Sequence, residues 1–172
     1  MVYSPTGDVE EDSSILIEIS MSLDSFVSSW TNCDRISTYI ARVVSQDRAD
    51  SLLYSNLFSS ALNELMETAF RSNGKTGRLH CNVLRAGRMD RIELVIPCDD
   101  KARNFYENAA ERLGSDDAAE LYTQALFSRG HVDPHIGLLE LAVDYKARLS
   151  IKPAAEDAIR LTAEFVLENG EL

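Results

Sequence analysis

Hydrophobic residues recur along this chain with two periods, and the period changes several times. They alternate with polar residues over 79–83 and form short β-branched runs at 15–19 and 92–96, which is typical of β-strands. Over 51–71 they recur every three or four residues instead, which predicts one long amphipathic helix. The stripe expected to face the core contains Leu53, Leu57, Ala61, Leu65 and Ala69, widened by Leu62, Met66 and Phe70.

Capping and turn residues divide the rest of the chain. Asp24 or Ser25 suits the start of a helix that runs to Val44, and Asp133-Pro134 suits an N-cap followed by the first helical position. Asn73-Gly74 is a helix stop because both residues tolerate positive φ. In order, we expect a strand at 15–19, two helices, a hairpin of 79–83 and 92–96, helices at 101–113, 116–129 and from 133, and a hairpin of 149–151 and 159–167 turned by 153–157.

This order predicts an α+β fold. The helices fall between strands that pair with their neighbours, so the simplest packing is a two-layer sandwich, with a mixed, mainly antiparallel sheet covered on one face by helices. Residues 1–14 are polar and acidic and are expected to form a flexible N-terminal lead-in. Residues 15–172 are expected to form a single domain, since no repeat or interdomain linker interrupts them.

Charge narrows the classes of partner. Seventeen Lys and Arg against 28 Asp and Glu give a net charge of -11, which repels nucleic acid and anionic membrane surfaces. No apolar run approaches the roughly 20 residues that span a bilayer, and the acidic start lacks the features of a signal peptide. We therefore expect a cytoplasmic protein without nucleic-acid or membrane partners.

Common catalytic and metal signatures are absent from the sequence. It contains no GxSxG, Walker, HExxH or GxGxxG motif. Cys33, Cys81 and Cys98 are scattered and are best read as small buried apolar residues. His131 and His135 flank the Asp133-Pro134 cap, and without a third ligand in view a loop role is favoured over metal binding.

One polar edge on the long helix admits two interpretations. Glu64 and Thr68 are four residues apart and share a helix face, which lies beside the apolar stripe rather than opposite it, and together with Asn63 they form a polar edge next to the core. This edge is either a helix boundary that faces water or part of a functional site, and the two interpretations carry similar weight.

The polar edge resembles a motif of the GHKL family of histidine-kinase-like ATPases. In that family a long helix carries Glu-x-x-x-Asn, often followed by Ala, and this chain has Glu64-Leu65-Met66-Glu67-Thr68-Ala69. The resemblance implies that Glu64 is the catalytic carboxylate, which orients water or a hydroxyl. It also implies that Thr68 stands at the Mg²⁺ ligand position, where it offers one oxygen without the amide of Asn.

Two further segments resemble the nucleotide-binding motifs of that family. After the first hairpin, Asp99 stands where the family has the Asp that contacts adenine, although both glycines of Asp-x-Gly-x-Gly are missing. Gly137-Leu138 matches the Gly-Leu at the start of the last helix, and the resemblance implies a phosphate-side backbone contact there. ATP and Mg²⁺ are the cofactors that these positions imply, while residues 101–130 replace the family's Gly-rich lid with helices.

The most similar subgroup is that of SiaB-type kinases and anti-sigma-factor serine kinases. The resemblance covers about 15–167 and implies a bacterial partner-switching system, in which a STAS-domain antagonist is bound or phosphorylated and a PP2C-type phosphatase reverses the mark. The favoured hypothesis is a regulator with degenerate ATP motifs that acts through protein–protein interaction. The alternatives are an active Mg-ATP-dependent serine/threonine kinase and an unrelated α+β domain.

Two groups of side chains could contact a partner protein. Phe26 and Trp30 suit either the core or a homodimer contact, and the core is favoured. A basic group near the first hairpin is interpreted as solvated hairpin ends, with a landing patch for an acidic partner as the alternative. That group contains Lys75, Arg78, Arg85, Arg88 and Arg91.

Overall fold

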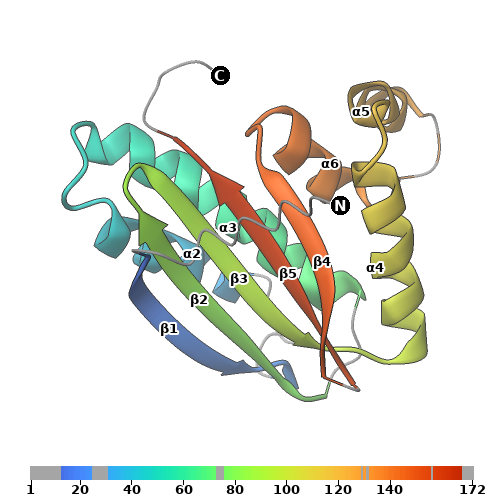
Figure 1. The fold of residues 1–172 in the computed structure, drawn as a ribbon, viewed down its shortest axis with the longest axis horizontal. Helices are drawn as coiled ribbons and strands as arrows, with labels where there is room; N and C mark the ends of the chain where they lie inside the picture. The colour runs from blue at the N-terminus through green and yellow to red at the C-terminus, as the bar shows by residue number, and fades with distance from the viewer. Residues whose placement is uncertain are drawn as a thin grey trace, which may run out of the picture.

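The computed structural model describes residues 13–24, 31–72, 76–128, 130, 132–155 and 157–167. In this part of the chain the elements follow the predicted order, with helices placed between a single strand and two hairpins (Figure 1). They are β1 (Ser14–Ser22), α2 (Thr31–Val44), α3 (Ser51–Ser72), β2 (Arg78–Ala86), β3 (Met89–Pro97), α4 (Asp100–Leu113), α5 (Ala118–Phe127), α6 (Ile136–Val143), β4 (Arg148–Ala155) and β5 (Ala158–Phe165).

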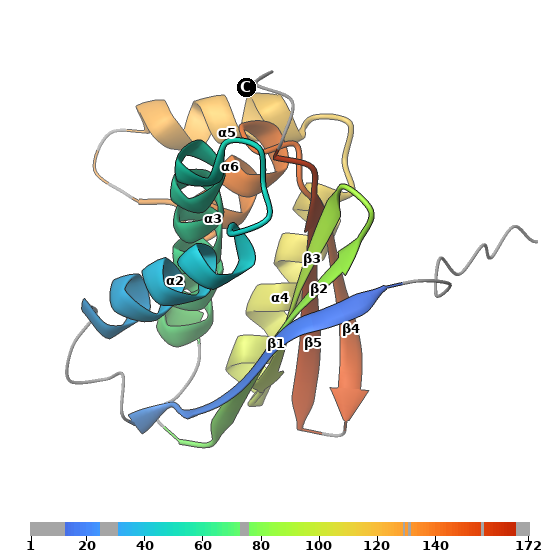
Figure 2. The ribbon, with the colours of Figure 1, turned by 90° about the vertical axis from the view of Figure 1, so that its left-hand side faces the viewer.

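The five described strands form one sheet in the order β1-β2-β3-β5-β4. All four pairings between them are antiparallel. Figure 2 shows the sheet nearly edge-on, with the described helices on one side of it. This arrangement confirms the α+β two-layer sandwich, and the strand order adds the pairing of β3 with β5, which joins residues about 70 positions apart.

Alternation along the strands separates a helix-covered face of the sheet from an open face. On β3, Asp90, Ile92, Leu94 and Ile96 are buried beneath the helices, while the residues between them are partly exposed. Ring contacts join the layers, because Phe58 of α3 lies edge-on against Phe165 of β5 at 5.9 Å between centroids. The core therefore lies between the sheet and α3.

The buried stripe of α3 is rotated from the predicted one at its N-terminal end. Tyr54 and Phe58 are buried there, whereas Leu53 is 45% exposed. Both aromatic side chains fill the core, and Tyr54 also lies beneath the guanidinium of Arg48, 4.8 Å from the ring centroid. From Ala61 onward the stripe is as predicted.

Two element boundaries differ from the sequence predictions. The last helix begins at Ile136 rather than at Pro134, because the Asp133 carboxylate accepts a hydrogen bond from the His135 amide and closes a turn before the helix. The strand β4 extends through Pro153, which was predicted as part of a turn. An edge strand accommodates proline because one of its sides needs no N–H donor, and the register shifts next to Pro153.

Several expectations fall outside the described residues. These are the lead-in over 1–12, Phe26 and Trp30, the Asn73-Gly74 stop, Lys75 and His131. Within the described part, Cys33, Cys81 and Cys98 are free and buried, as predicted, and burial raises the pKa of the Cys33 thiol to about 11. No described helix has the length and hydrophobicity needed to cross a membrane.

Candidate functional site

The structure brings Glu64 and Thr68 of α3 together with Gly137 in the first turn of α6. A Cβ atom on Gly137 would lie 3.3 Å from Thr68 Oγ1 and well inside van der Waals contact of Glu64 Oε2. Glycine is therefore the residue that lets α6 approach α3 this closely. Three of the five predicted site residues thus meet where the two helices pack side by side.

Glu64 is held in an acidic environment at this contact. Burial is the main reason that its pKa is raised above the ordinary value, and repulsion from Glu140 of α6 adds to the effect. Arg71 acts in the opposite direction, with its guanidinium 3.8 Å from Glu64 Oε2. The pKa of Glu140 is itself raised, first by burial and then by Asp144. Two partly buried carboxyl groups are therefore close enough to repel each other, and Arg71 offsets part of this effect at Glu64.

Thr68 contributes a buried hydroxyl that has no partner. The residue is 2% exposed, and its Oγ1 accepts or donates no hydrogen bond in the structure. A buried hydroxyl without a partner costs free energy, so such an atom is worth explaining. It lies at the contact with Gly137, which is where the family resemblance placed the metal ligand.

Asp99 and Leu138 have different surroundings: Asp99 is exposed at the start of α4, whereas Leu138 is buried. The Asp99 carboxylate caps α4 and accepts a hydrogen bond from the Ala102 amide at 2.7 Å. Leu138, a residue of α6, is fully buried in the core. The structure shows a helix cap and a core residue at these two positions, and their assigned roles in nucleotide binding stay predictions.

A phosphate does not fit between α3 and α6 as they are packed. The gap between the Cα of Gly137 and the side chains of Glu64 and Thr68 is too small for a methyl group, and a phosphate or hydrated Mg²⁺ is larger. The neighbouring carboxylates of Glu64 and Glu140 would also repel phosphate oxygens. Among the described residues, no group of three or more His, Cys, Asp or Glu side chains is placed to hold a metal ion.

An ion-pair network that the sequence did not reveal fixes the start of α6 against α4. Arg112 donates two hydrogen bonds to the Asp133 carboxylate, at 2.8 and 2.7 Å. The same guanidinium lies 3.0 Å from His135 Nδ1, while His135 Nε2 lies 3.1 Å from the carbonyl oxygen of Phe105. A neutral His135 with its proton on Nε2 satisfies both contacts. His135 therefore has the structural loop role that the sequence favoured.

The predicted basic group near the first hairpin is divided between the two faces of the sheet. Arg85 points toward the helices, where it donates to Asp90 at 2.8 Å and to the carbonyl oxygen of Val44 at 2.7 Å. Arg91 lies on the open face and pairs with Glu164. These residues consequently form no single patch.

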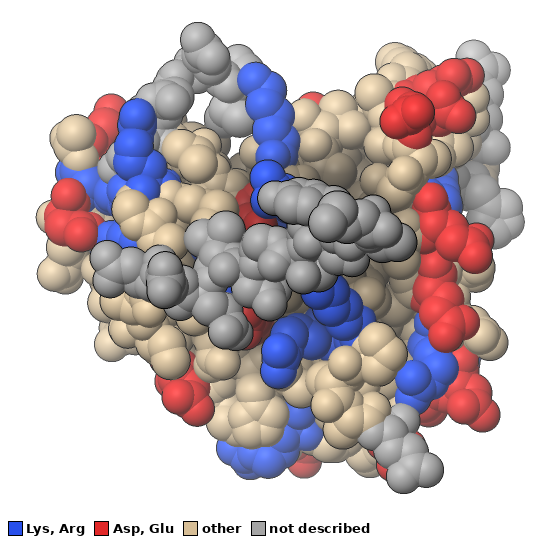
Figure 3. Space-filling view, viewed as in Figure 1, with Lys and Arg blue, Asp and Glu red and all other residues tan. Residues whose placement is uncertain are grey.

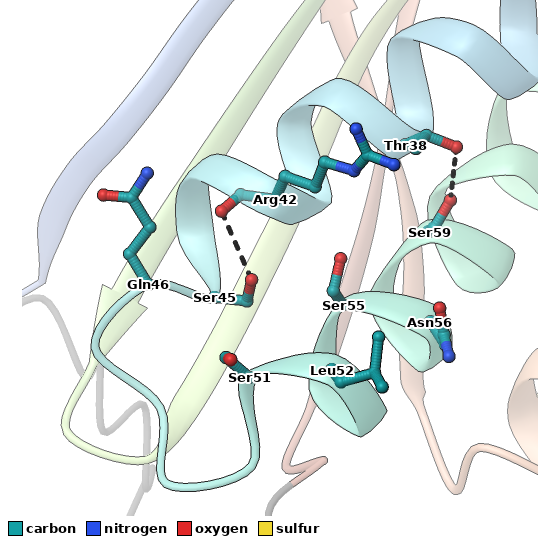
Figure 4. A pocket seen from close by; sticks show the side chains of 9 residues that line it. All are labelled: Thr38, Arg42, Ser45, Gln46, Ser51, Leu52, Ser55, Asn56 and Ser59. Carbon is teal, nitrogen blue, oxygen red and sulfur yellow. Dashed lines mark hydrogen bonds between the residues drawn. The ribbon is translucent and has the colours of Figure 1, made fainter.

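Within the described part of the chain, a cavity lies on each flank of α3. A cavity of about 400 Å³ adjoins the acidic contact and is lined by Leu57, Glu140, Val143, Asp144, Tyr145 and Lys146. The other, of about 350 Å³, is a groove between α2 and α3 (Figure 4). It is lined by Thr38, Arg42, Ser45, Gln46, Ser51, Leu52, Ser55, Asn56 and Ser59, with a 3.3 Å hydrogen bond between Thr38 and Ser59 across it. None of the predicted site residues lines either cavity.

Comparison with known proteins supports the fold. No protein-family model and no curated protein sequence matches the chain. Among solved structures, it is similar to a chain in the crystal structure of the SiaB–SiaC complex from Pseudomonas aeruginosa, with a TM-score of 0.60 and 14% sequence identity. The match covers 88% of this chain and 90% of that one. The chain therefore has a SiaB-like fold over nearly its whole length, while the low identity leaves activity to be argued from the site.

Proposed function

We propose that this chain is a regulatory protein of a bacterial partner-switching system, which acts by binding a protein partner and does not turn over ATP. The proposal combines the SiaB-like fold with the GHKL-like motifs of the sequence and takes the STAS-domain antagonist as the expected partner. The observation that supports it is the close contact of Gly137 with Glu64 and Thr68, which leaves no room for a ligand between these three residues as they are packed.

The state of the other motif residue supports the same proposal. Asp99 already accepts a hydrogen bond from the first turn of α4, and neither glycine of the family's motif follows it. Contact with an adenine amino group would compete with this cap, which typically contributes about 1 kcal/mol to stability. Asp99 therefore has a structural role of its own at the start of α4.

Exposed apolar side chains on α5 support binding to a protein. Leu126 and Phe127, at the end of α5, are 53% and 79% exposed. They belong to the helical segment that stands where the GHKL family has its lid. Large apolar side chains that are adjacent and exposed to water often mark protein interfaces. We expect Phe127→Ser to weaken binding to a purified STAS-domain partner, and Val166→Ser, which changes another exposed apolar residue, to leave it unchanged.

A thermal-shift measurement with nucleotide tests the proposal. A ligand present at 100 times its Kd stabilises the native state by about 2.7 kcal/mol, which raises the Tm of a chain of this size by several degrees. We expect millimolar Mg-ATP to leave the Tm unchanged relative to Mg²⁺ alone. A rise with Mg-ATP that disappears when Mg²⁺ is removed would overturn the proposal.

A second candidate is an active Mg-ATP-dependent serine/threonine kinase. The observation that favours it is the unpartnered Thr68 Oγ1 beside Glu64, since a metal ligand would be left without a partner when no metal is bound. This function requires α6 to move away from α3. Incubation with Mg-ATP and a STAS-domain protein, followed by phosphopeptide mass spectrometry, would show phosphate transfer for the native chain and its loss in Glu64→Gln.

A further inference from the structure

The face of the sheet that points away from the helices is an extensive surface with no described helix against it (Figure 2). In Figure 3, which views this side, Lys and Arg side chains appear over the central strands, whereas Asp and Glu gather along the edge that α4 and α5 form. From the strand register, the charged residues of the open face are Glu18, Arg78, Arg91, Glu93, Arg148, Lys152, Arg160 and Glu164.

The charge of this face is opposite in sign to that of the molecule. Its described strands carry five cationic side chains and three carboxylates, in a chain whose net charge is -11. Glu164 is shared by Arg91 at 2.6 Å and Arg148 at 3.5 Å, and Arg91 also lies 3.9 Å from Glu93. The carboxylates near the middle strands are thus already paired with cations of the same face.

Lys152 and Arg160 stand apart from these pairs. They are directly opposite each other on β4 and β5, both are exposed, and neither has a carboxylate partner among the residues that the structure describes. Like charges directly opposite each other on adjacent strands destabilise a sheet. The same cross-strand row continues through Val95 to His80 on β2, and Arg78 lies two residues before His80.

We propose that the row Lys152–Arg160–Val95–His80, with Arg78 beside it, is a second interaction surface that binds an extended acidic segment of a protein partner. Carboxylates of the segment would form ion pairs with Lys152 and Arg160, and an apolar side chain of the segment would contact Val95. Strands are about 4.8 Å apart, so β4 to β2 spans roughly 14 Å, the length of four or five extended residues.

A protein segment matches this surface better than a nucleic acid does. The row is short and includes the neutral Val95, whereas a phosphate backbone presents evenly spaced charge that extends beyond the row. The rest of the molecule is strongly acidic and would repel such a polymer. This surface lies on the opposite side of the sheet from the helices, so the proposal does not depend on whether ATP binds.

The test uses a short synthetic peptide rich in Asp and Glu with a central Leu, titrated into the ¹⁵N-labelled full chain at low salt. We expect amide shifts concentrated at Lys152, Arg160, Val95 and His80, and no binding of the peptide in which Asn and Gln replace the acids. Lys152→Glu with Arg160→Glu should lower the affinity at least about tenfold. The matched control, Arg35→Glu with Lys101→Glu, makes the same change in net charge at exposed helix positions and should bind like the native chain.

Several results would overturn the proposal. Equal loss of binding in the control variant would mean that net charge alone attracts the peptide. Tighter binding of duplex DNA or of anionic phospholipid vesicles would assign the surface to another class of partner. Self-association that only the Lys152 and Arg160 variant abolishes would assign it to a second copy of the chain. A circular dichroism spectrum and a Tm like those of the native chain confirm that each variant is folded.

Discussion

At Gly137, the absence of a side chain decides how closely two helices approach. Glycine inside a helix costs up to about 1 kcal/mol relative to alanine, so its presence in α6 needs a compensating gain. That gain is the contact with α3, where the atoms nearest to a Cβ would be Glu64 Oε2 and Thr68 Oγ1. Because Glu64 Oε2 is at the end of a flexible, partly exposed side chain, its removal relieves most of the clash.

The effect of Gly137→Ala on the free energy of unfolding is therefore expected to be opposite in the native chain and in a Glu64→Ala variant. In the native chain it should lower the free energy of unfolding, since the new methyl group displaces the Glu64 carboxylate. In a Glu64→Ala background the same change should be neutral or stabilising by up to about 1 kcal/mol, because helix propensity is then the main effect. Urea unfolding of the four proteins of this cycle measures the coupling. Additive effects would show that Gly137 and Glu64 do not meet in solution.

Thr68→Val separates a buried structural hydroxyl from a metal ligand. Valine has nearly the same shape, so this change removes the unpartnered Oγ1 without opening a cavity. We expect stabilisation of about 1 kcal/mol, since the hydroxyl loses its hydrogen bonds to water on folding and gains none. Thr38→Val is the control, because Thr38 has a hydrogen bond with Ser59 and should show no such gain. Destabilisation by Thr68→Val would mean that its hydroxyl has a partner in solution.

At the scale of elements, α4 depends on Asp99 for its first turn. The carboxylate accepts a hydrogen bond from the Ala102 amide, one of the amides that a helix leaves without a partner at its start. Asp99→Ala is expected to lower stability by about 1 kcal/mol, and Asp99→Ser to retain most of it, because serine also caps helices well. Thermal and urea unfolding would measure both. If the two variants were equally stable, the cap would contribute nothing and Asp99 would be free for another role.

Comparison of the predicted and observed elements shows which features of the fold are determined by the local sequence. Helices and strands were predicted in the right order because periodicity, caps and turns are local signals. The start of α6 was misplaced because the Asp133 carboxylate pairs with Arg112, which is 21 residues away, and closes a turn instead of starting the helix. Tyr54 was likewise missed in the core, since it is buried beneath Arg48, a contact that helix periodicity does not contain.

At the scale of the whole molecule, contacts between distant segments limited the prediction of the site. The motifs that resemble those of the GHKL family identified Glu64, Thr68 and Gly137 as candidate site residues, and the structure places these three in contact. The like-charged Glu140 beside Glu64 could not be foreseen, because it depends on the rotation of α6 against α3. Arg85 was grouped with surface cations for a similar reason, since its buried partner Asp90 is recognised only from the register of β2 and β3.

The shifted pKa values of the carboxyl groups predict how the stability of the fold depends on pH. The pKa values of Glu64 and Glu140 are raised in the fold, so their charged forms destabilise it, and stability should increase as pH falls from 7 toward their ordinary value of 4.5. The pKa values of Asp47 and Asp133 are lowered by Arg85 and Arg112, so their contribution is retained above 3.8 and lost below it. We therefore expect the Tm to be highest near pH 4 to 5.

A Glu64→Gln and Glu140→Gln variant should have a higher Tm at pH 7 and a smaller rise on acidification, measured by differential scanning fluorimetry. An equal rise in the native chain and the variant would instead assign the effect to the general loss of negative charge in this acidic molecule.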